Sequence, residues 1–313
     1  MNEFFRKPLL ETFETIELLF NARVSEEEIQ VGLFRVPIPN FDRRAFREAF
    51  VNALVHRDFS RLGAVHVRLD DDGLSISNPG GFVEGVTLDN LLVADPRSRN
   101  PLLADAIKRI GLAERTGRGI DRIFEGMLRY GRPAPDYSMT DAYTVSVRMQ
   151  SAETDLEFLR MVIVQEEKSG DMPIDTLIIL SHLRQERRLT TADLTAYTQK
   201  PEQTTRNAIE KLVEAGLVEA HGQGRGRTYT LSVRVYRHSG QKAAYVRQAG
   251  FEAIQQEQMV LAYIDKHGSI KRAEAAELCR IGPFQATRLL KRLTDDGKIA
   301  PKGKGKGVVY VQR

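Results

Sequence analysis

A repeat in the second half of the sequence constrains the fold more than any other feature. Residues 209–218 align without a gap with residues 290–299, which lie 81 positions later. At the same spacing four glycines coincide, since Gly216, Gly222, Gly224 and Gly226 fall on Gly297, Gly303, Gly305 and Gly307. Self-similarity of this length indicates a duplicated structural unit, whatever the local propensities are. The C-terminal part is therefore predicted to hold two copies of one module.

Each copy has the hydrophobic periodicity of three helices followed by two short strands. In the first copy Thr191 is expected to cap the second helix, Pro201 to open the third, and Gly216 to end it. The helices are expected at 174–185, 191–196 and 201–215, and in the second copy at 256–266, 271–280 and 283–295. The strands are expected at 217–219 and 227–231, then at 298–300 and 308–311. This order resembles the winged helix-turn-helix family, whose third helix enters the major groove of DNA.

Polar and basic residues mark the surfaces that would meet double-stranded DNA. Arg, Asn and Gln can bond base edges, whereas Lys mostly contacts phosphates. The candidates on the third helices are Gln203, Thr204, Arg206, Asn207 and Lys211, and then Gln285, Arg288, Lys291 and Arg292. The candidates on the glycine-rich hairpin loops are Arg225, Arg227, Lys302, Lys304 and Lys306. The alternative is that these modules serve only in packing or dimerisation.

The distribution of charge favours a polyanionic partner for the C-terminal end. Residues 221–313 contain 18 Lys and Arg against 7 Asp and Glu, a net charge of +11. Residues 1–220 contain 28 against 35, a net charge of −7. Such asymmetry indicates a basic nucleic-acid-binding end attached to a mildly acidic body.

The first 150 residues carry a different pattern, which begins with a helix expected from about Arg43 to Asp58. On it Glu48, Asn52 and His56 are spaced four apart and share one ridge. A carboxylate followed one turn later by a carboxamide can hold a hydrated Mg²⁺ ion and polarise a water molecule. A solvated helix face produces the same spacing, so this motif alone does not decide the function.

Glycine turns follow this helix at two places. Strands expected at 64–69 and 74–77 lead into Asn78-Pro79-Gly80-Gly81, and Gly117-Arg118-Gly119 precedes an amphipathic stretch at 120–130. Glycines before a helix let backbone N–H groups approach phosphates at the positive helix end. A closing strand is expected at 143–149.

Four phrases in order make this region recognisable: 47–58, 78–81, 99–102 and 117–120. They resemble the GHKL ATPase superfamily, and more closely the divergent ATP-binding domain of predicted bacterial and archaeal transcriptional regulators, some described as helicase-related. The resemblance covers about residues 30–150 and extends into the winged helices. It implies an α+β chain, in which a Bergerat-type α/β sandwich precedes two winged helix-turn-helix domains.

The resemblance also implies site residues and the cofactors ATP and Mg²⁺. Glu48 would orient or activate the attacking water, and Asn52 would bind the metal. Asn78 would take the place of the aspartate that contacts the adenine amino group, and Thr144 would contact the base edge. The glycines would shape the adenine-side turn (Gly80, Gly81) and the phosphate loop (Gly117, Gly119).

Two departures from the superfamily pattern keep other functions open. Asn78 offers only a neutral amide oxygen where the family has an anion, which weakens adenine selectivity by about 1 kcal/mol. The glycine pair at 117 and 119 is shorter than the glycine lid of active members. Binding without turnover, weak DNA-dependent hydrolysis and a vestigial scaffold are therefore the alternatives to a ligand-responsive regulator. A helicase proper is not expected, because the chain has no Gly-x-x-x-x-Gly-Lys-Ser/Thr loop.

The remaining sequence signals concern organisation. The domains are expected at 1–150 and 173–236, with a connecting helix at 151–172, a linker at 237–252 and the last module at 253–313. Relatives carry a Schlafen-like domain for which the residues before Arg43 leave no room, and an amphipathic stretch at 13–20 would serve as a strap or dimer contact. The single Cys279 and the absence of a signal peptide or apolar span predict a cytoplasmic protein without disulfides, and palindromic DNA sites favour a homodimer.

Overall fold

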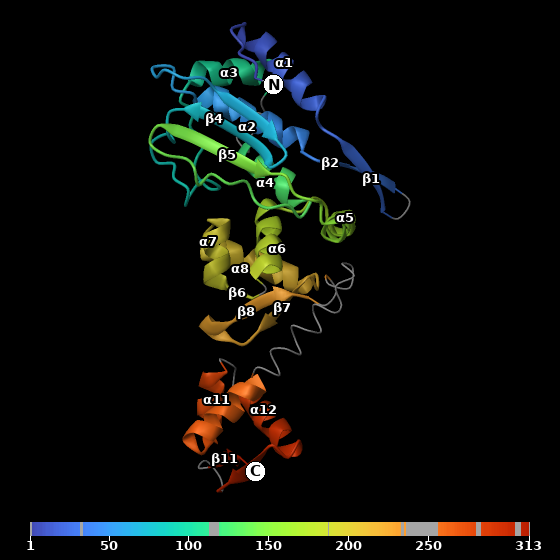
Figure 1. Cartoon of the computed structure of the whole chain (residues 1–313), viewed down its shortest axis with the longest axis vertical. Helices are drawn as coiled ribbons and strands as arrows, with labels where there is room; N and C mark the ends of the chain where they lie inside the picture. Colours follow the sequence, from blue (N-terminus) through green and yellow to red (C-terminus); the bar gives the residue numbers. More distant parts are fainter. Residues whose placement is uncertain are drawn as a thin grey trace. The chain divides into compact units, whose positions relative to one another are not determined.

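The computed structural model describes residues 2–31, 34–112, 119–186, 188–232, 235, 256–279, 283–303 and 308–312. The chain divides into two compact units (Figure 1), one made of residues 1–219 and 229–239 and the other of residues 220–228 and 240–313. The mixture of helices with small antiparallel sheets places the chain in the α/β class in its broad sense. Among the described residues no helix has the length and apolar character needed to cross a membrane.

The N-terminal region is built on an antiparallel sheet with strand order β3-β4-β5. Helices α2 and α4 lie on one face of this sheet (Figure 1). Leu74 pairs with Met149 and Ile76 with Val147, and these four side chains are buried in the core. The elements are α2 (Arg43–His56), β3 (His66–Asp70), β4 (Gly73–Pro79), α4 (Gly119–Leu128) and β5 (Thr144–Gln150).

Helix α1 (Leu9–Asn21) belongs to this core. The ring of Phe20 stacks on Phe46 of α2 with centroids 3.7 Å apart, and Phe13 stacks on Phe50 at 5.3 Å. Asp42 caps α2 by accepting a hydrogen bond from Ala45 N at 2.8 Å. The predicted amphipathic stretch at 13–20 is thus a helix that uses its apolar face inside the fold.

Three elements of this region were not predicted from the sequence. The hairpin of β1 (Glu26–Val31) and β2 (Phe34–Pro39) starts with three consecutive glutamates, which hide the two-residue period of a strand. Helix α3 (Pro101–Arg109) has only nine residues, with Pro101 in its first turn.

The first repeat copy consists of three helices and a three-stranded antiparallel sheet of order β6-β8-β7. Thr190, rather than Thr191, caps α7, because Asp193 lies three residues after Thr190 and completes a reciprocal capping box. Pro201 lies at the N-cap of α8 instead of in its first turn. Helix α5 (Leu156–Ser169) precedes this copy. The elements of the copy are α6 (Ile174–Glu186), β6 (Leu189–Thr190), α7 (Thr191–Thr198), α8 (Glu202–Glu214), β7 (Val218–His221), the 3-10 turn η1 (Gly224–Gly226) and β8 (Thr228–Leu231).

The second copy repeats this order of elements. A helix at 256–267 precedes β9, α11 and α12, and the strands pair in the order β10-β11-β9. Val260, Ile264, Leu290 and Leu293 form its core with almost no exposed surface. The elements are β9 (Ile270–Lys271), α11 (Arg272–Leu278), α12 (Pro283–Asp295), β10 (Ile299–Lys302) and β11 (Val309–Gln312).

We predict that Phe20→Ala lowers the free energy of unfolding by about 3–5 kcal/mol, because the truncation leaves a cavity beside Phe46. The control is Leu18→Ala on the same helix, whose residue is 70% exposed and whose loss should cost less than about 0.5 kcal/mol. Urea unfolding followed by far-UV circular dichroism measures both. Equal, small effects of the two variants would mean that the packing of α1 contributes little to the stability of the core.

Candidate functional site

A cavity of about 470 Å³ opens in the N-terminal region. Its volume lies in the range of small-molecule and cofactor sites. The polar ridge of α2 and the segment 81–98 supply much of its lining. Residues of β4, β5 and α3, the start of α4 and Tyr137 also line it.

The ridge of α2 predicted from the sequence faces this cavity. Glu48, Asn52 and His56 all line it, as their spacing of one helical turn requires. Glu48 is only 7% exposed. Its carboxylate is therefore held inside the fold and does not belong to a solvated helix face.

The first residue of α4 lies directly against this ridge. A Cβ atom at Gly119 would stand 2.8 Å from Oε2 of Glu48 and 3.4 Å from Nδ2 of Asn52. A side chain there would displace the Glu48 carboxylate, so the structure brings together three of the predicted site residues. Gly117, the other predicted glycine of this loop, lies outside the described residues.

Asn78 lies at the end of β4 and also lines the cavity, with 3% of its surface exposed. Its Nδ2 atom donates to the carbonyl oxygen of Pro79 at 3.1 Å. This bond fixes the orientation of the amide and leaves Oδ1 as the acceptor side of the group.

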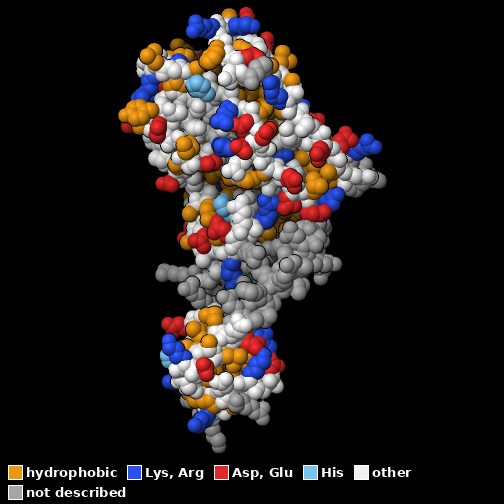
Figure 2. Space-filling view, in the orientation of Figure 1, with side chains coloured by type: hydrophobic (Ala, Val, Ile, Leu, Met, Phe, Trp, Pro, Cys, Tyr) orange, Lys and Arg blue, Asp and Glu red, His pale blue; other side chains and the backbone are white. Residues whose placement is uncertain are grey.

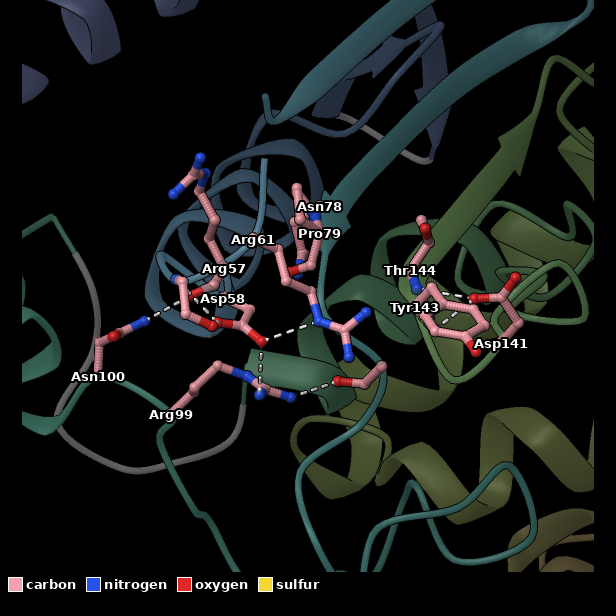
Figure 3. Close-up of polar contacts among 12 residues, drawn as sticks. Arg57, Asp58, Arg61, Asn78, Pro79, Arg99, Asn100, Asp141, Tyr143 and Thr144 are labelled. Atoms are coloured by element: carbon pink, nitrogen blue, oxygen red, sulfur yellow. Dashed lines mark hydrogen bonds and ion pairs between the residues drawn. The ribbon is translucent and has the colours of Figure 1, made fainter. Parts of the chain in front are cut away.

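Of the other predicted residues, Gly81 lines the cavity, whereas Gly80 and Thr144 are not among its lining residues. Gly80 has a φ of +96°, and a Cβ there would approach Cβ of Asp58 to 2.7 Å. The backbone N–H of Thr144 donates to the Asp141 carboxylate at 2.7 Å (Figure 3), and its neighbour Val145 is the residue that reaches the cavity. Gly80 thus helps to shape the turn, as the resemblance implies, and Thr144 is anchored through its backbone.

A polar network around Asp58 and Arg99 holds the glycine turn in place (Figure 3). The backbone N–H of Asp58 donates to Pro79 O at 2.8 Å, and its carboxylate accepts from Arg61 Nε at 3.1 Å. Arg99 lies 3.7 Å from the same carboxylate and donates through Nη2 to Gly81 O at 2.7 Å. The end of α2, the glycine turn and the segment before α3 are thereby joined.

Asn100 closes this network. Its Nδ2 atom donates to Val55 O and Arg57 O, each at 2.8 Å, at the end of α2 where helical carbonyls lack partners. Asp58, Arg99 and Asn100 were present in the phrases that carry the family resemblance, but no role was predicted for them. Only the motif could have pointed to these three residues, because neither charge nor periodicity indicates a residue that positions others.

Electrostatics differ across the site. Burial, assisted by the positive charge of Arg99, lowers the pKa of His56, so this ring is neutral at pH 7. Hydrogen bonds from Ser60 lower the pKa of Asp58, and Arg61 and Arg99 add to the effect. The ionised Asp58 thus compensates the two arginines beside the turn.

The rest of the wall comes from residues that sequence reasoning missed. Val86, Leu91, Leu92 and Val93 supply apolar surface from the segment 81–98. Tyr137, whose pKa is raised by burial, stacks on Phe124 at 6.5 Å. The charged residues that line the cavity outside the α2 ridge are Asp95, Arg97, Lys108 and Asp121. A loop wall has no periodicity, so only the folded chain places these residues.

The predicted DNA-contacting residues on the two third helices are exposed. On α8, Arg206 pairs with Glu202, and Gln203 donates to Asn207 at 3.0 Å. The exposed residues are Gln203, Thr204, Arg206, Asn207 and Lys211 on α8, and Gln285, Arg288, Lys291 and Arg292 on α12. Figure 2 shows several Lys and Arg side chains at the surface of the described part of the second module, among acidic and apolar ones.

The two helices differ in charge, because α8 carries two basic and three acidic residues whereas α12 carries three basic and one acidic. On the hairpins, Arg227 is half-buried and Lys302 is exposed. Lys304, Lys306 and the side chain of Arg225 lie outside the described residues. Within the described ranges no three His, Cys, Asp or Glu side chains gather into a group that could hold a metal ion.

Comparison with known proteins agrees with the N-terminal geometry. Residues 63–149 match the family described as "Putative ATP-dependent DNA helicase recG C-terminal". This range contains Asn78, Gly81 and Gly119, and it begins after α2 with Glu48 and Asn52.

A similar solved structure is the crystal structure of the DIP2311 protein from Corynebacterium diphtheriae. The TM-score is 0.64 and the identity 28%, over 74% of this chain and 48% of that one. This chain thus spans about half the length of that protein. No curated protein matches. The chain therefore contains an ATPase-like domain, and the cavity lies within it and the helix that precedes it.

Proposed function

We propose that the chain is a DNA-binding transcriptional regulator in which an ATP-binding sensor domain controls two winged-helix modules. The observation that carries the proposal is the meeting of Glu48, Asn52 and Gly119 at one cavity of about 470 Å³. The family match over residues 63–149 supports a nucleotide as the ligand.

The residues present fit a nucleotide with Mg²⁺. The missing side chain at Gly119 leaves room beside Glu48 and Asn52, where a Cβ atom would fill the space. Magnesium bound with a nucleotide keeps most of its waters and needs one or two protein ligands. Asn52 would supply a carboxamide oxygen to the metal, and the Oδ1 atom of Asn78 would accept a hydrogen bond from an amino group of the base.

Each side chain would then have a separate task. When bound, Mg²⁺ neutralises charge on the phosphate oxygens. Glu48 would hold a water molecule through its carboxylate, and the start of α4 would present backbone N–H groups to the phosphates. The apolar segment around Leu91 and Leu92 would exclude solvent from the base.

The C-terminal part supports DNA as the partner. The element order of both copies suits winged-helix modules, each with an exposed third helix and a hairpin. The basic surface of α12 and the lysine-rich sequence that begins at Lys302 suit contacts to phosphates. We further propose a cytoplasmic homodimer, because two-fold symmetric regulators read palindromic sites.

The nucleotide site is tested with Gly119→Ala, whose Cβ would displace the Glu48 carboxylate and occupy the space beside Asn52. We expect affinity for ATP with Mg²⁺ to fall at least about tenfold, the effect of roughly 1.4 kcal/mol of lost interaction. The matched control is Gly226→Ala, since a Cβ there meets nothing within 4 Å. Isothermal titration calorimetry measures both variants, and unchanged affinity in Gly119→Ala would remove the nucleotide from the proposal.

The DNA interface is tested with the double variant Arg288→Ala/Lys291→Ala. If both side chains contact phosphates, affinity for duplex DNA falls and the slope of log K against log salt becomes shallower by about 2. The control Arg109→Ala/Lys168→Ala removes two exposed cations from the first unit. Fluorescence anisotropy over a salt series distinguishes them, and identical slopes would exclude α12 as the interface.

The second candidate is a DNA-dependent ATPase, which the burial of Glu48 beside Asn52 favours. In that case Glu48→Gln abolishes phosphate release while ATP affinity stays within about threefold, since the amide keeps the shape but lacks the negative charge. A coupled phosphate assay with and without duplex DNA measures turnover. Equal turnover in the variant and the unsubstituted protein would exclude Glu48 as the catalytic residue.

A further inference from the structure

Gln199, at the end of α7, adopts a backbone conformation that is unusual for its type. Its φ of 57° and ψ of 12° are left-handed, and among the described non-glycine residues it alone has a positive φ. Glycine or asparagine normally ends a helix in this way, because in other residues the Cβ atom lies too close to the following carbonyl oxygen. Such an outlier persists where other contacts determine it.

The side chain of Gln199 supplies those contacts. Its Nε2 atom donates to Leu88 O at 2.7 Å, and its Oε1 atom accepts from Leu92 N at 2.8 Å. Both partners belong to the segment 81–98 of the ATPase-like domain, and Leu92 itself lines the cavity. One amide of the first module thus clamps the backbone of the cavity wall.

Hydrogen bonds within the segment 81–98 hold its turn together. The Oδ1 atom of Asn90 accepts from Thr87 N at 2.8 Å, and its Nδ2 atom donates to Gly85 O at 2.8 Å. Because Asn90 ties the turn internally, a force on Leu92 acts on the neighbouring cavity residues as well.

The turn that carries Gln199 is tied to the rest of its module on both sides. The hydroxyl of Thr198 shares a buried hydrogen bond of 2.8 Å with Thr205 on α8. Lys200 lies 3.2 Å from the Asp175 carboxylate on α6. A displacement of Gln199 is therefore transmitted to α8, the helix predicted to read DNA.

A second set of contacts holds the module near the other end of α6. Arg184 pairs with Asp155 at 2.7 Å, donates to Gly131 O, and lies over the ring of Phe158. Gly131 follows the end of α4, the helix that starts at the cavity with Gly119. The module is thus fixed near the far end of α4 and clamped at the cavity wall.

We infer that Gln199 is a latch through which occupation of the cavity controls the first module. This inference rests on the proposed nucleotide site and names its output. The cavity is formed while the latch is closed, so a ligand that uses the wall at Leu92 stabilises the closed latch. By thermodynamic reciprocity, opening the latch lowers the affinity for the ligand by the same factor by which the ligand stabilises the closed latch.

The test uses Gln199→Gly and Gln199→Asn in the full chain. Both residues tolerate the left-handed conformation, so neither threatens the fold. Glycine lacks the amide, and asparagine is one methylene too short to keep both bonds. We expect the Leu92 amide to exchange its hydrogen on the order of tenfold faster, and affinity for ATP with Mg²⁺ to fall on the order of tenfold.

The control is Gln185→Ala, an exposed glutamine near the end of α6 in the same module, which should change neither quantity. Hydrogen exchange read by NMR follows Leu92, and calorimetry follows ATP. Unchanged exchange in both Gln199 variants overturns the latch. Faster exchange with unchanged ATP affinity overturns the coupling. If the unsubstituted chain binds no ATP, the proposed nucleotide function fails, and the exchange rates still decide whether Gln199 holds the wall.

Discussion

The close approach of α4 to α2 is the constraint on which the site depends. Two glycines on one face of α4 permit it, since a Cβ at Gly126 would stand 2.7 Å from Cβ of Ala45 and one at Gly119 would meet Glu48. With a larger residue at Gly126 α4 would move outward, because close-packed interiors do not absorb an added methyl group. The polar ridge of α2 would then face open solvent instead of a bounded cavity. Because α4 packs closely on α2, its start lies against the ridge and its other end lies near the first module.

The sequence predicted what depends on periodicity and missed what depends on tertiary contact. The ridge of Glu48, Asn52 and His56 follows from the helical repeat, and the duplicated module follows from the coincidence of glycines. Gly80 was expected to shape the turn, and it packs there against Asp58; Thr144 was expected to contact the base edge by resemblance, but it is not among the residues that line the cavity, and its backbone bonds Asp141. The family motif contained the right segment, but the motif alone does not say which side of a turn faces a ligand.

The segment 81–98 shows the limit of sequence reasoning most clearly. Its apolar residues have neither helical nor strand spacing, so no rule of amphipathicity marks them as a cavity wall. The sequence predicted no role for Gln199 either, because a polar residue after a helix has the pattern of any solvent-exposed cap. Its meaning comes from partners more than 100 residues away in sequence. Long-range hydrogen bonds to backbone groups leave no local pattern.

The two modules share an order of elements but differ in their electrostatic surroundings. On α8 Arg206 forms an ion pair with Glu202, and Gln203 donates a hydrogen bond to Asn207. Internally satisfied side chains gain less from a phosphate, since an existing contact must first be broken. A module whose turn is clamped to the cavity wall is suited to transmit a signal, and the more basic copy is suited to hold DNA. Duplication followed by such divergence lets affinity and control change independently, because substitutions on α12 leave the Gln199 contact intact.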